Sequence, residues 1–110
     1  MKVSIITSCY NREKTIRGCI ESVLAQDYPD IEYIIVDGAS TDGSLAVINE
    51  YKAKIAKIIS ESDKGMYEGI NKGICAATGD IVGLVHSDDF LYSPHTISNI
   101  VKRFEETHAD

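Results

Sequence analysis

The feature of this sequence that most constrains its fold is a repeated alternation of short β-branched runs with helical apolar stripes. The runs have the length of buried strands and occupy residues 2–8, 31–37, 56–60 and 80–85. Their hydrophobicity is nearly continuous, which is typical of strands that are covered on both faces. The order strand then helix, repeated along the chain, predicts a three-layer α/β/α fold with a mostly parallel sheet and right-handed crossovers.

Helical periodicity occupies the segments between these runs. A first stripe starts at Ile16, and we expect Asn11 to cap that helix, with Glu13 in its first turn. Ser93 followed by Pro94 is typical of an N-cap and a first helical residue. The stripes that we expect to pack in the core are Ile16, Cys19, Ile20, Val23 and Leu24; Leu45, Ile48 and Tyr51; Met66, Ile70, Ile74 and Ala77; and Ile97, Ile100, Val101 and Phe104.

Length and composition indicate a single folded domain over residues 1–110. Hydrophobic residues make up 44% of the chain and charged residues 25%, as in ordinary globular proteins. A net charge of −6 with scattered Lys and Arg argues against a nucleic-acid partner. Because the N-terminal apolar run is short and is interrupted by polar residues, we expect no signal peptide. We therefore expect a cytoplasmic protein, with the inner face of the membrane as an alternative location.

Cysteine and glycine usage suggests structural roles. Cys9, Cys19 and Cys75 form no CxxC pair, so we expect small buried side chains and neither disulfides nor a zinc site. Gly65, Gly69 and Gly73 recur every fourth residue. Such a spacing costs helix propensity and indicates close packing of that helix against the sheet.

An acidic pair follows the last strand run. In a parallel sheet of this kind, ligands bind beyond the carboxyl ends of the strands. Asp88 and Asp89 would repel each other unless solvent or a cation compensates them. A hard divalent ion suits the pair, because Mg²⁺ uses one or two protein carboxylates and completes its shell with water and phosphate. The alternative interpretation is that one of the two caps the following helix.

Asp37 and Tyr10, at the ends of two other strands, each allow two interpretations. Asp37 could start a turn or cap a helix beginning near Ser40, or it could accept a hydrogen bond from a nucleobase or ribose. Tyr10 could stack on a base or could close the strand end as a half-buried side chain. No Walker or dinucleotide-binding motif occurs, and the acidic pair stands after the wrong strand for a phosphorylatable receiver module.

Four segments together resemble the N-terminal half of family 2 glycosyltransferases with the GT-A fold. They are SIITSCYNR, SVLAQDYPDIEYIIVDGASTDGS, SESDKGMYEGINKGICAATGD and LVHSDD, and the resemblance covers essentially the whole chain. It implies a truncated GT-A, Rossmann-like domain that binds a nucleotide-diphospho-sugar. The ordered set is much more specific than any one of its motifs.

The resemblance also implies roles for individual residues. The SDD segment is a variant of the DxD motif: Asp88 would face the ribose or donor sugar or share the metal, and Asp89 would bind Mg²⁺ or Mn²⁺. Lys64, supported by Asp63, is a candidate contact for the diphosphate. The residues implied to hold the base and ribose are Thr7, Ser8, Tyr10 and Asp37.

The implied activity is inverting transfer of a sugar from a UDP-, GDP- or dTDP-linked donor to a hydroxyl of a glycan or lipid-linked acceptor, in polysaccharide biosynthesis. The general base of the family lies downstream of the metal motif, so it is expected beyond Asp110, and the isolated chain could be inactive. A sugar nucleotidyltransferase would require a Gly-rich basic loop that TSCYNREK lacks. A nucleotide-binding regulatory module without transferase activity remains an alternative.

Two further expectations concern His86 and the sheet edge. His86 stands where the family more often has a small or amide residue, and it could be a metal neighbour, a pH-sensitive contact or a plain strand-end residue. An uncovered sheet edge in the chain would favour a weak homodimer.

Overall fold

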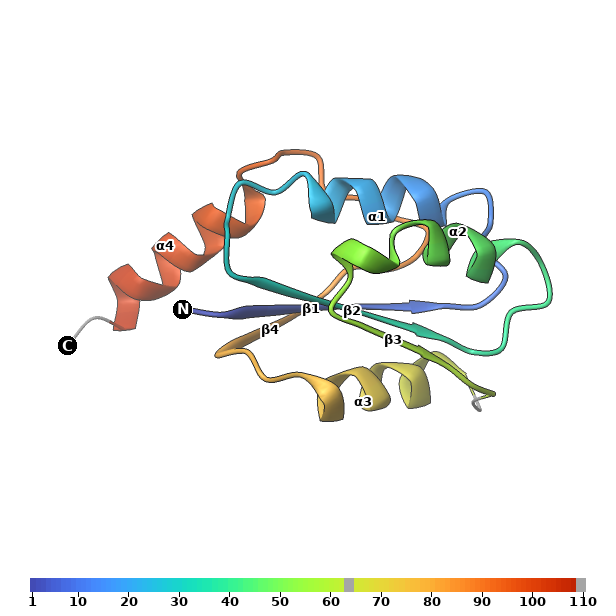
Figure 1. Cartoon of the computed structure of the whole chain (residues 1–110). Helices are drawn as coiled ribbons and strands as arrows, with labels where there is room; N and C mark the ends of the chain where they lie inside the picture. Colours follow the sequence, from blue (N-terminus) through green and yellow to red (C-terminus); the bar gives the residue numbers. More distant parts are fainter. Residues whose placement is uncertain (63–64, 109–110) are drawn as a thin grey trace.

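A computed structural model describes residues 1–62 and 65–108 of the chain, and in it a parallel sheet lies between two helical layers (Figure 1). The strands are β1 (Val3–Cys9), β2 (Ile31–Asp37), β3 (Lys57–Ser60) and β4 (Ile81–Leu84). Their order across the sheet is β3-β2-β1-β4, and every neighbouring pair is parallel. The predicted α/β/α architecture is confirmed.

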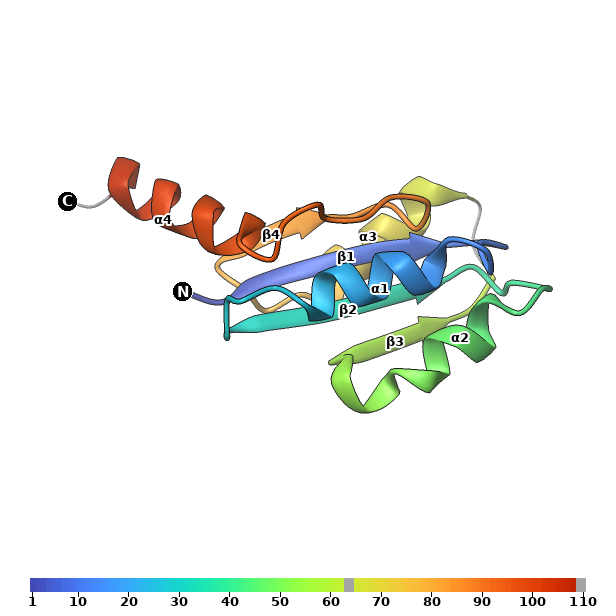
Figure 2. The ribbon, with the colours of Figure 1, turned by 90° about the horizontal axis from the view of Figure 1, so that it is seen from above.

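The helices divide between the two faces of the sheet. One face carries α1 (Ile16–Leu24), α2 (Ser44–Glu50) and the short 3₁₀ helix η1 (Lys52–Lys54). The opposite face carries α3 (Met66–Ala76), while α4 (Thr96–His108) projects past the end of the sheet (Figures 1 and 2). Over the described residues, no helix is both long enough and apolar enough to traverse a bilayer.

Alternation along β1 and β2 builds two separate apolar layers. Successive side chains of a strand point to opposite faces, so both strands contribute to each layer. On the α1 side, Ile5 and Ile35 pack with buried residues of α1 such as Ile20. On the α3 side, Ile6 and Ile34 form a smaller buried cluster with Val36. The nearly continuous hydrophobicity of these strands therefore reflects burial on both faces.

α3 approaches the sheet through its glycines. A Cβ atom on Gly73 would lie 2.5 Å from Cγ2 of Ile6, and Gly69 is also buried. The expected close packing is confirmed at Gly73. The expected burial of Ile74 is wrong, since that side chain is 47% exposed. The reason is that the glycine face of α3, and not its neighbouring apolar position, turns toward the sheet.

Several helix starts differ from the sequence-based expectations. α1 begins at Ile16, so Asn11 lies too far upstream to cap it. α4 begins at Thr96, and the Ser93 hydroxyl accepts a hydrogen bond from the His95 N–H at 3.1 Å within the turn before the helix. Ile100 and Phe104 are exposed, contrary to expectation, because α4 turns Ile97 and Val101 toward the core.

Two of the three cysteines are buried as expected. Burial raises the pKa of Cys9 to about 11 and also raises the pKa of Cys19, so both remain neutral thiols near pH 7. Cys75 is exposed on α3, which contradicts the expected burial. The reason is the same as for Ile74, because α3 buries its glycine face.

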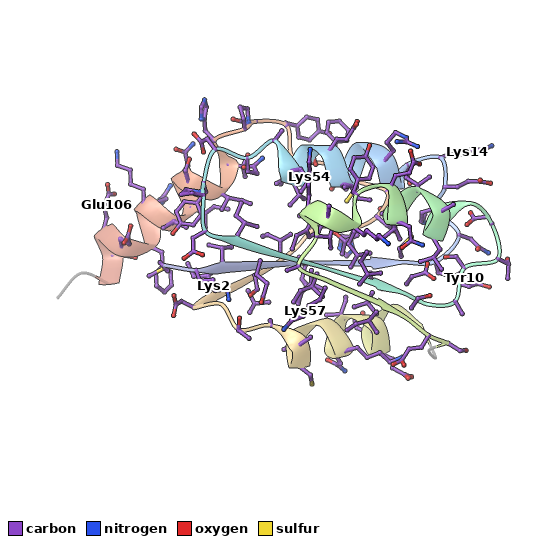
Figure 3. The ribbon with its side chains drawn as sticks, in the orientation of Figure 1. Lys2, Tyr10, Lys14, Lys54, Lys57 and Glu106 are labelled. Atoms are coloured by element: carbon purple, nitrogen blue, oxygen red, sulfur yellow. The ribbon has the colours of Figure 1, made fainter. Side chains whose placement is uncertain are left out.

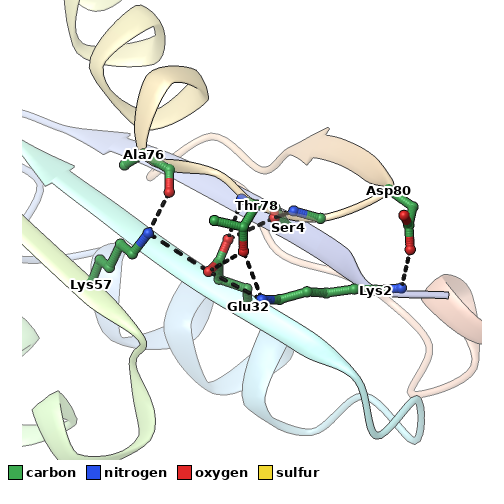
Figure 4. Close-up of polar contacts among 8 residues, drawn as sticks. Lys2, Ser4, Glu32, Lys57, Ala76, Thr78 and Asp80 are labelled. Atoms are coloured by element: carbon green, nitrogen blue, oxygen red, sulfur yellow. Dashed lines mark hydrogen bonds and ion pairs between the residues drawn. The ribbon is translucent and has the colours of Figure 1, made fainter.

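A buried carboxylate, that of Glu32, forms several hydrogen bonds near the start of β2. Glu32 is 7% exposed and accepts hydrogen bonds from the Ser4 hydroxyl at 2.8 Å, the Thr78 N–H at 2.9 Å and the Thr78 hydroxyl at 2.9 Å (Figure 4). Lys2 and Lys57 lie 3.6 Å and 3.8 Å from it. This Glu32 cluster joins β1, β2 and the α3–β4 connection at the edge opposite the strand carboxyl ends.

Candidate functional site

The strand order brings the polar loops to one edge of the sheet. β4 lies beside β1 although it is last in sequence, and Cys9 of β1 is in register with Asp37 of β2. The chain leaves β1 toward the α1 face, whereas the connection between β3 and β4 crosses the other face. Such a reversal of strand order is where open α/β sheets bind ligands. Tyr10 and Lys14 lie at this carboxyl edge (Figure 3).

An acidic turn follows β4 at the same edge. Asp88 and Asp89 are both exposed. The Asp89 N–H donates to the His86 carbonyl at 3.0 Å, and the Asp89 carboxylate accepts from the Phe90 N–H at 2.8 Å. Since α4 begins only at Thr96, the interpretation of either acid as a cap of that helix is wrong. His86 is exposed and closes the turn through its carbonyl, in agreement with a strand-end role.

The acidic turn fits a metal that takes few protein ligands. Within residues 1–62 and 65–108, no group of three or more His, Cys, Asp or Glu side chains is arranged to hold an ion. None of the ion pairs formed by those residues involves Asp88 or Asp89, so their carboxylate oxygens are not committed to an internal cation. Mg²⁺ and similar hard cations commonly use one or two carboxylates and fill their remaining positions with water and phosphate oxygens. The donor set therefore suits an open site and excludes a closed one among these residues.

Asp37 forms a turn at the end of β2. It is fully buried, and its carboxylate accepts from the Ser40 N–H at 3.0 Å and from the Ser60 hydroxyl at 3.1 Å. The turn interpretation is confirmed, whereas capping of a helix at Ser40 is wrong because α2 begins at Ser44. Contact of Asp37 with a base or ribose stays a prediction.

Asn11 joins the loops that follow β1 and β2, a role that was not predicted. It has a left-handed backbone with φ 52°. Its side-chain oxygen accepts from the Thr41 N–H at 2.8 Å and the Asp42 N–H at 3.3 Å, and its own N–H donates to the Ser40 hydroxyl at 2.9 Å. The available signal was the residue type, because Asn directly after a strand favours a left-handed turn.

The predicted contacts from β1 divide between the surface and the core. Tyr10 is 58% exposed, which leaves its ring accessible, and its stacking on a base stays a prediction. Ser8 is partly buried at the end of β1. Thr7 is fully buried, and its hydroxyl lies 2.9 Å from the Tyr33 hydroxyl. Alternation in β1 turns Thr7 toward α1 and the core, and its contact with a ligand stays a prediction, as for the equally buried Asp37.

A shallow hollow of about 300 Å³ lies in the loop after β1. This volume is at the lower end of the range of ligand pockets. Its lining residues are Asn11, Arg12, Glu13, Lys14, Thr15 and Asp42. The predicted contacts of Lys64 and Asp63 lie outside the described residues.

Comparison with known sequences gives a family match over nearly the whole chain. The model of the family described as glycosyl transferase family 2 matches residues 4–110. An uncharacterized glycosyltransferase of Nostoc sp. is 39% identical over 108 residues, covering 96% of this chain and 33% of the relative. The putative glycosyltransferase EpsE of Bacillus subtilis is 37% identical over 95 residues, covering 83% of this chain and 34% of the relative. The chain thus spans about a third of the length of these relatives.

Solved structures show the same fold. Residues 1–349 of S. aureus TarS in complex with UDP-GlcNAc match with a TM-score of 0.90 and 30% identity, over 98% of this chain and 32% of that chain. The mannosyltransferase PcManGT from Pyrobaculum calidifontis, in complex with GDP-Man and Mn²⁺, matches with a TM-score of 0.85 and 29% identity, over 92% of this chain and 31% of that chain. Both similarities extend over most of the chain.

Proposed function

Since the chain belongs to glycosyl transferase family 2, we propose that it forms the nucleotide-sugar-binding part of a metal-assisted glycosyltransferase. The observation that carries the proposal is the exposed Asp88–Asp89 pair, which lies beyond β4 at the reversal of strand order beside β1. An alternative activity would have to explain two adjacent carboxylates, free of internal cations among the described residues, at the edge where such sheets bind ligands.

The donor in this proposal is a nucleotide-diphospho-sugar. TarS was solved with UDP-GlcNAc and PcManGT with GDP-Man, and both match this chain closely in fold. The exposed ring of Tyr10 would stack on the base, while Asp37 and Ser8 would support base and ribose from the neighbouring strand ends. Lys64 is proposed as a diphosphate contact. A UDP-, GDP- or dTDP-linked donor meets these requirements.

The acidic turn would hold Mg²⁺ or Mn²⁺ together with the donor. In the proposal Asp89 binds the ion, and Asp88 binds it too or faces the ribose or donor sugar. The Mn²⁺ complex of PcManGT supports this use of a divalent ion. When bound, the ion supplies positive charge that stabilises the departing diphosphate. The residues of the chain then serve to bind the donor and to orient its anomeric carbon.

The finer parts of the proposal concern the acceptor and the cellular location. We infer that transfer is inverting, with the hydroxyl of a glycan or lipid-linked acceptor as nucleophile, in the biosynthesis of a polysaccharide. The general base is expected beyond Asp110. We expect a cytoplasmic site of action, with the inner face of the membrane as an alternative location, together with weak homodimer formation.

The test is metal-dependent binding of nucleoside diphosphates. Isothermal titration calorimetry with UDP, GDP and dTDP, each with Mn²⁺ and with EDTA, should show binding of at least one nucleotide that is much stronger with Mn²⁺. Asp89→Asn should weaken that binding by at least about tenfold, as expected for the loss of a contact with a charged group. Asp30→Asn, at an exposed position before β2, is a matched control and should leave binding unchanged.

Two results would contradict the proposal. One is the absence of binding heat for all three nucleotides in the presence of Mn²⁺. The other is equal affinity of the wild type and Asp89→Asn, which would show that the acidic turn takes no part in binding.

A further inference from the structure

The acidic turn is attached to the beginning of α1 by a side chain. The Thr15 hydroxyl donates to the Ser87 carbonyl at 2.9 Å, and Ser87, directly before the Asp88–Asp89 pair, is 6% exposed. Thr15 occupies the N-cap position of α1, yet its side chain makes no capping hydrogen bond to that helix. Its hydroxyl also lies 3.5 Å from the Arg12 carbonyl, so its shorter hydrogen bond is the one to the acidic turn.

α1 and the residues directly after it hold the segment that leads from the acidic turn to α4. The Ser22 hydroxyl accepts from the Leu91 N–H at 3.0 Å. The Gln26 amide donates to the Ser93 carbonyl at 2.8 Å and accepts from the Ile97 N–H at 3.0 Å. Figure 2 shows this segment, in orange, running back beside α1 to the start of α4.

These three side chains lie at the start of α1, within it and directly after its end. Thr15 is the N-cap of α1, Ser22 lies within the helix, and Gln26 follows the C-cap Ala25. We call them the polar seam. Residues 87–95, all within the described part of the chain, belong to no strand or helix. Their backbone groups thus depend on partners outside secondary structure, and the polar seam supplies several of them.

We propose that the polar seam positions the acidic turn for its metal, with Thr15 as the positioning residue nearest the carboxylates. The inference rests on the proposed function, because it assigns the acidic turn to metal binding. Thr15 touches neither metal nor donor in this scheme. It fixes the Ser87 carbonyl, and thereby the turn in which one Asp89 oxygen is already held by the Phe90 N–H.

Thr15→Val is the informative change, because valine keeps the shape of threonine and lacks the hydroxyl. With UDP or GDP, whichever binds the wild type, we expect the affinity in Mn²⁺ to fall by about two- to tenfold, the effect of one net hydrogen bond. The affinity in EDTA and the thermal midpoint should stay close to wild type. Thr15→Ser, which retains the hydroxyl, should restore the affinity in Mn²⁺.

Amide hydrogen exchange tests the same inference without any nucleotide. Thr15→Val should accelerate exchange in residues 87–91 by several-fold and leave β1 and β2 unchanged. Thr15→Ser should show wild-type exchange. Thr107→Val makes the same chemical change on an exposed part of α4 and should leave residues 87–91 unaffected.

The outcomes separate this inference from the proposed function. If the wild type binds no nucleotide in Mn²⁺, the proposed function fails, and exchange alone then shows whether Thr15 holds the turn. If the wild type binds but Thr15→Val loses affinity equally in Mn²⁺ and in EDTA, Thr15 contacts the nucleotide directly and the positioning role is overturned. Unchanged exchange in residues 87–91 overturns it as well.

Discussion

Glu32 is a charged residue that the fold neutralises from several sides. Burial alone raises the pKa of Glu32, but hydrogen bonds from the Thr78 N–H and from the Ser4 and Thr78 hydroxyls, together with the Lys2 ammonium, outweigh burial and lower this pKa to about 2. The ordinary pKa of a glutamate is 4.5. The lowered pKa means that the ionised form of Glu32 stabilises the folded state.

This stabilisation has a defined dependence on pH. Because the folded pKa lies below the unfolded one, the contribution is fully present above pH 4.5 and is lost as the pH falls from there toward about 2. Glu32→Gln should lower the free energy of unfolding by about 1–2 kcal/mol at pH 7. Urea denaturation from pH 7 to pH 2 should show this difference shrinking at the acidic end.

A matched substitution separates the Glu32 cluster from general charge effects. Glu106→Gln removes an exposed carboxylate of α4 (Figure 3) and should change stability very little at any pH. A constant difference between the wild type and Glu32→Gln down to pH 2 would contradict the role assigned to the ionised carboxylate.

Asn11 combines an unusual backbone conformation with side-chain hydrogen bonds, and two substitutions distinguish them. Asn11→Gly keeps the left-handed backbone at φ 52° but loses the hydrogen bonds from the Thr41 and Asp42 N–H groups. This loss should lower the free energy of unfolding by about 1 kcal/mol. Asn11→Ala should cost about 1–2 kcal/mol more, because alanine is strained in that region. Thermal unfolding of the three proteins should follow the order wild type, Gly, Ala. Equal stability of the Gly and Ala variants would show that the backbone is not strained.

At the scale of elements, the close approach of α3 to the sheet depends on Gly73. Gly73→Ala would place a methyl group 2.5 Å from Cγ2 of Ile6, which is itself 1% exposed and cannot withdraw. We expect the free energy of unfolding to fall by about 1–2 kcal/mol, because the cost of overpacking exceeds the gain in helix propensity. Chemical denaturation measures the change.

Gly18 of α1 provides the matched control for this prediction. A Cβ atom there meets nothing within 4 Å. Gly18→Ala should therefore stabilise the chain by about 0.5–1 kcal/mol through helix propensity alone. A Gly73→Ala variant that is as stable as the wild type would show that α3 shifts freely over the sheet.

The strands were predictable from the sequence because burial on both faces leaves a continuous apolar run. The run at residues 31–37 coincides with β2, and the other strands differ from their predicted ranges by one or two residues. Helix starts were less predictable. Asn11 and Ser93 have side chains typical of helix caps, but neither caps a helix. Asn11 and Asp37 instead make contacts between segments that are distant in sequence. A local pattern cannot show which of its polar groups will meet a partner from another strand.

The candidate site was predictable to a similar extent. The placement of Asp88 and Asp89 at the carboxyl edge followed from their position directly after the last strand run, since parallel strands end at one edge. The burial of Thr7 was not predictable. In an unbroken apolar run, the sequence does not show which face of the strand each residue occupies. The polar seam of α1 was also missed, since the apolar stripe of that helix was its stronger periodic signal.

At the scale of the whole molecule, stability and binding are assigned to opposite ends of the sheet. The Glu32 cluster closes the edge at which β2 begins, and the acidic turn occupies the edge at which β4 ends. This separation leaves the carboxyl edge free to hold exposed acids and polar loops. It also predicts that substitutions in the Glu32 cluster lower stability without changing nucleotide affinity in the folded protein.

The two lateral edges of the sheet differ in their protection against self-association. β3 carries Lys57, and a charged residue discourages edge-to-edge pairing. β4 has the sequence IVGL, without charge, and among the described strands none pairs with its outer side. Val82 and Leu84 are 43% and 48% exposed. They lie on the same face of the sheet as Ile6, which α3 covers. They are exposed because α3 packs on β1 and β2 and does not extend over β4.

A second copy of this chain is the natural partner for such an edge, since two β4 strands can pair about a two-fold axis. The strand is only four residues long, so the buried area should stay well below the roughly 800 Å² per partner of a stable interface. We therefore expect a concentration-dependent monomer–dimer equilibrium in size-exclusion chromatography with light scattering. Val82→Lys should shift it to the monomer, whereas Tyr67→Lys, on exposed α3, should not. A single monomeric species of the wild type at all concentrations would show that the β4 edge does not pair.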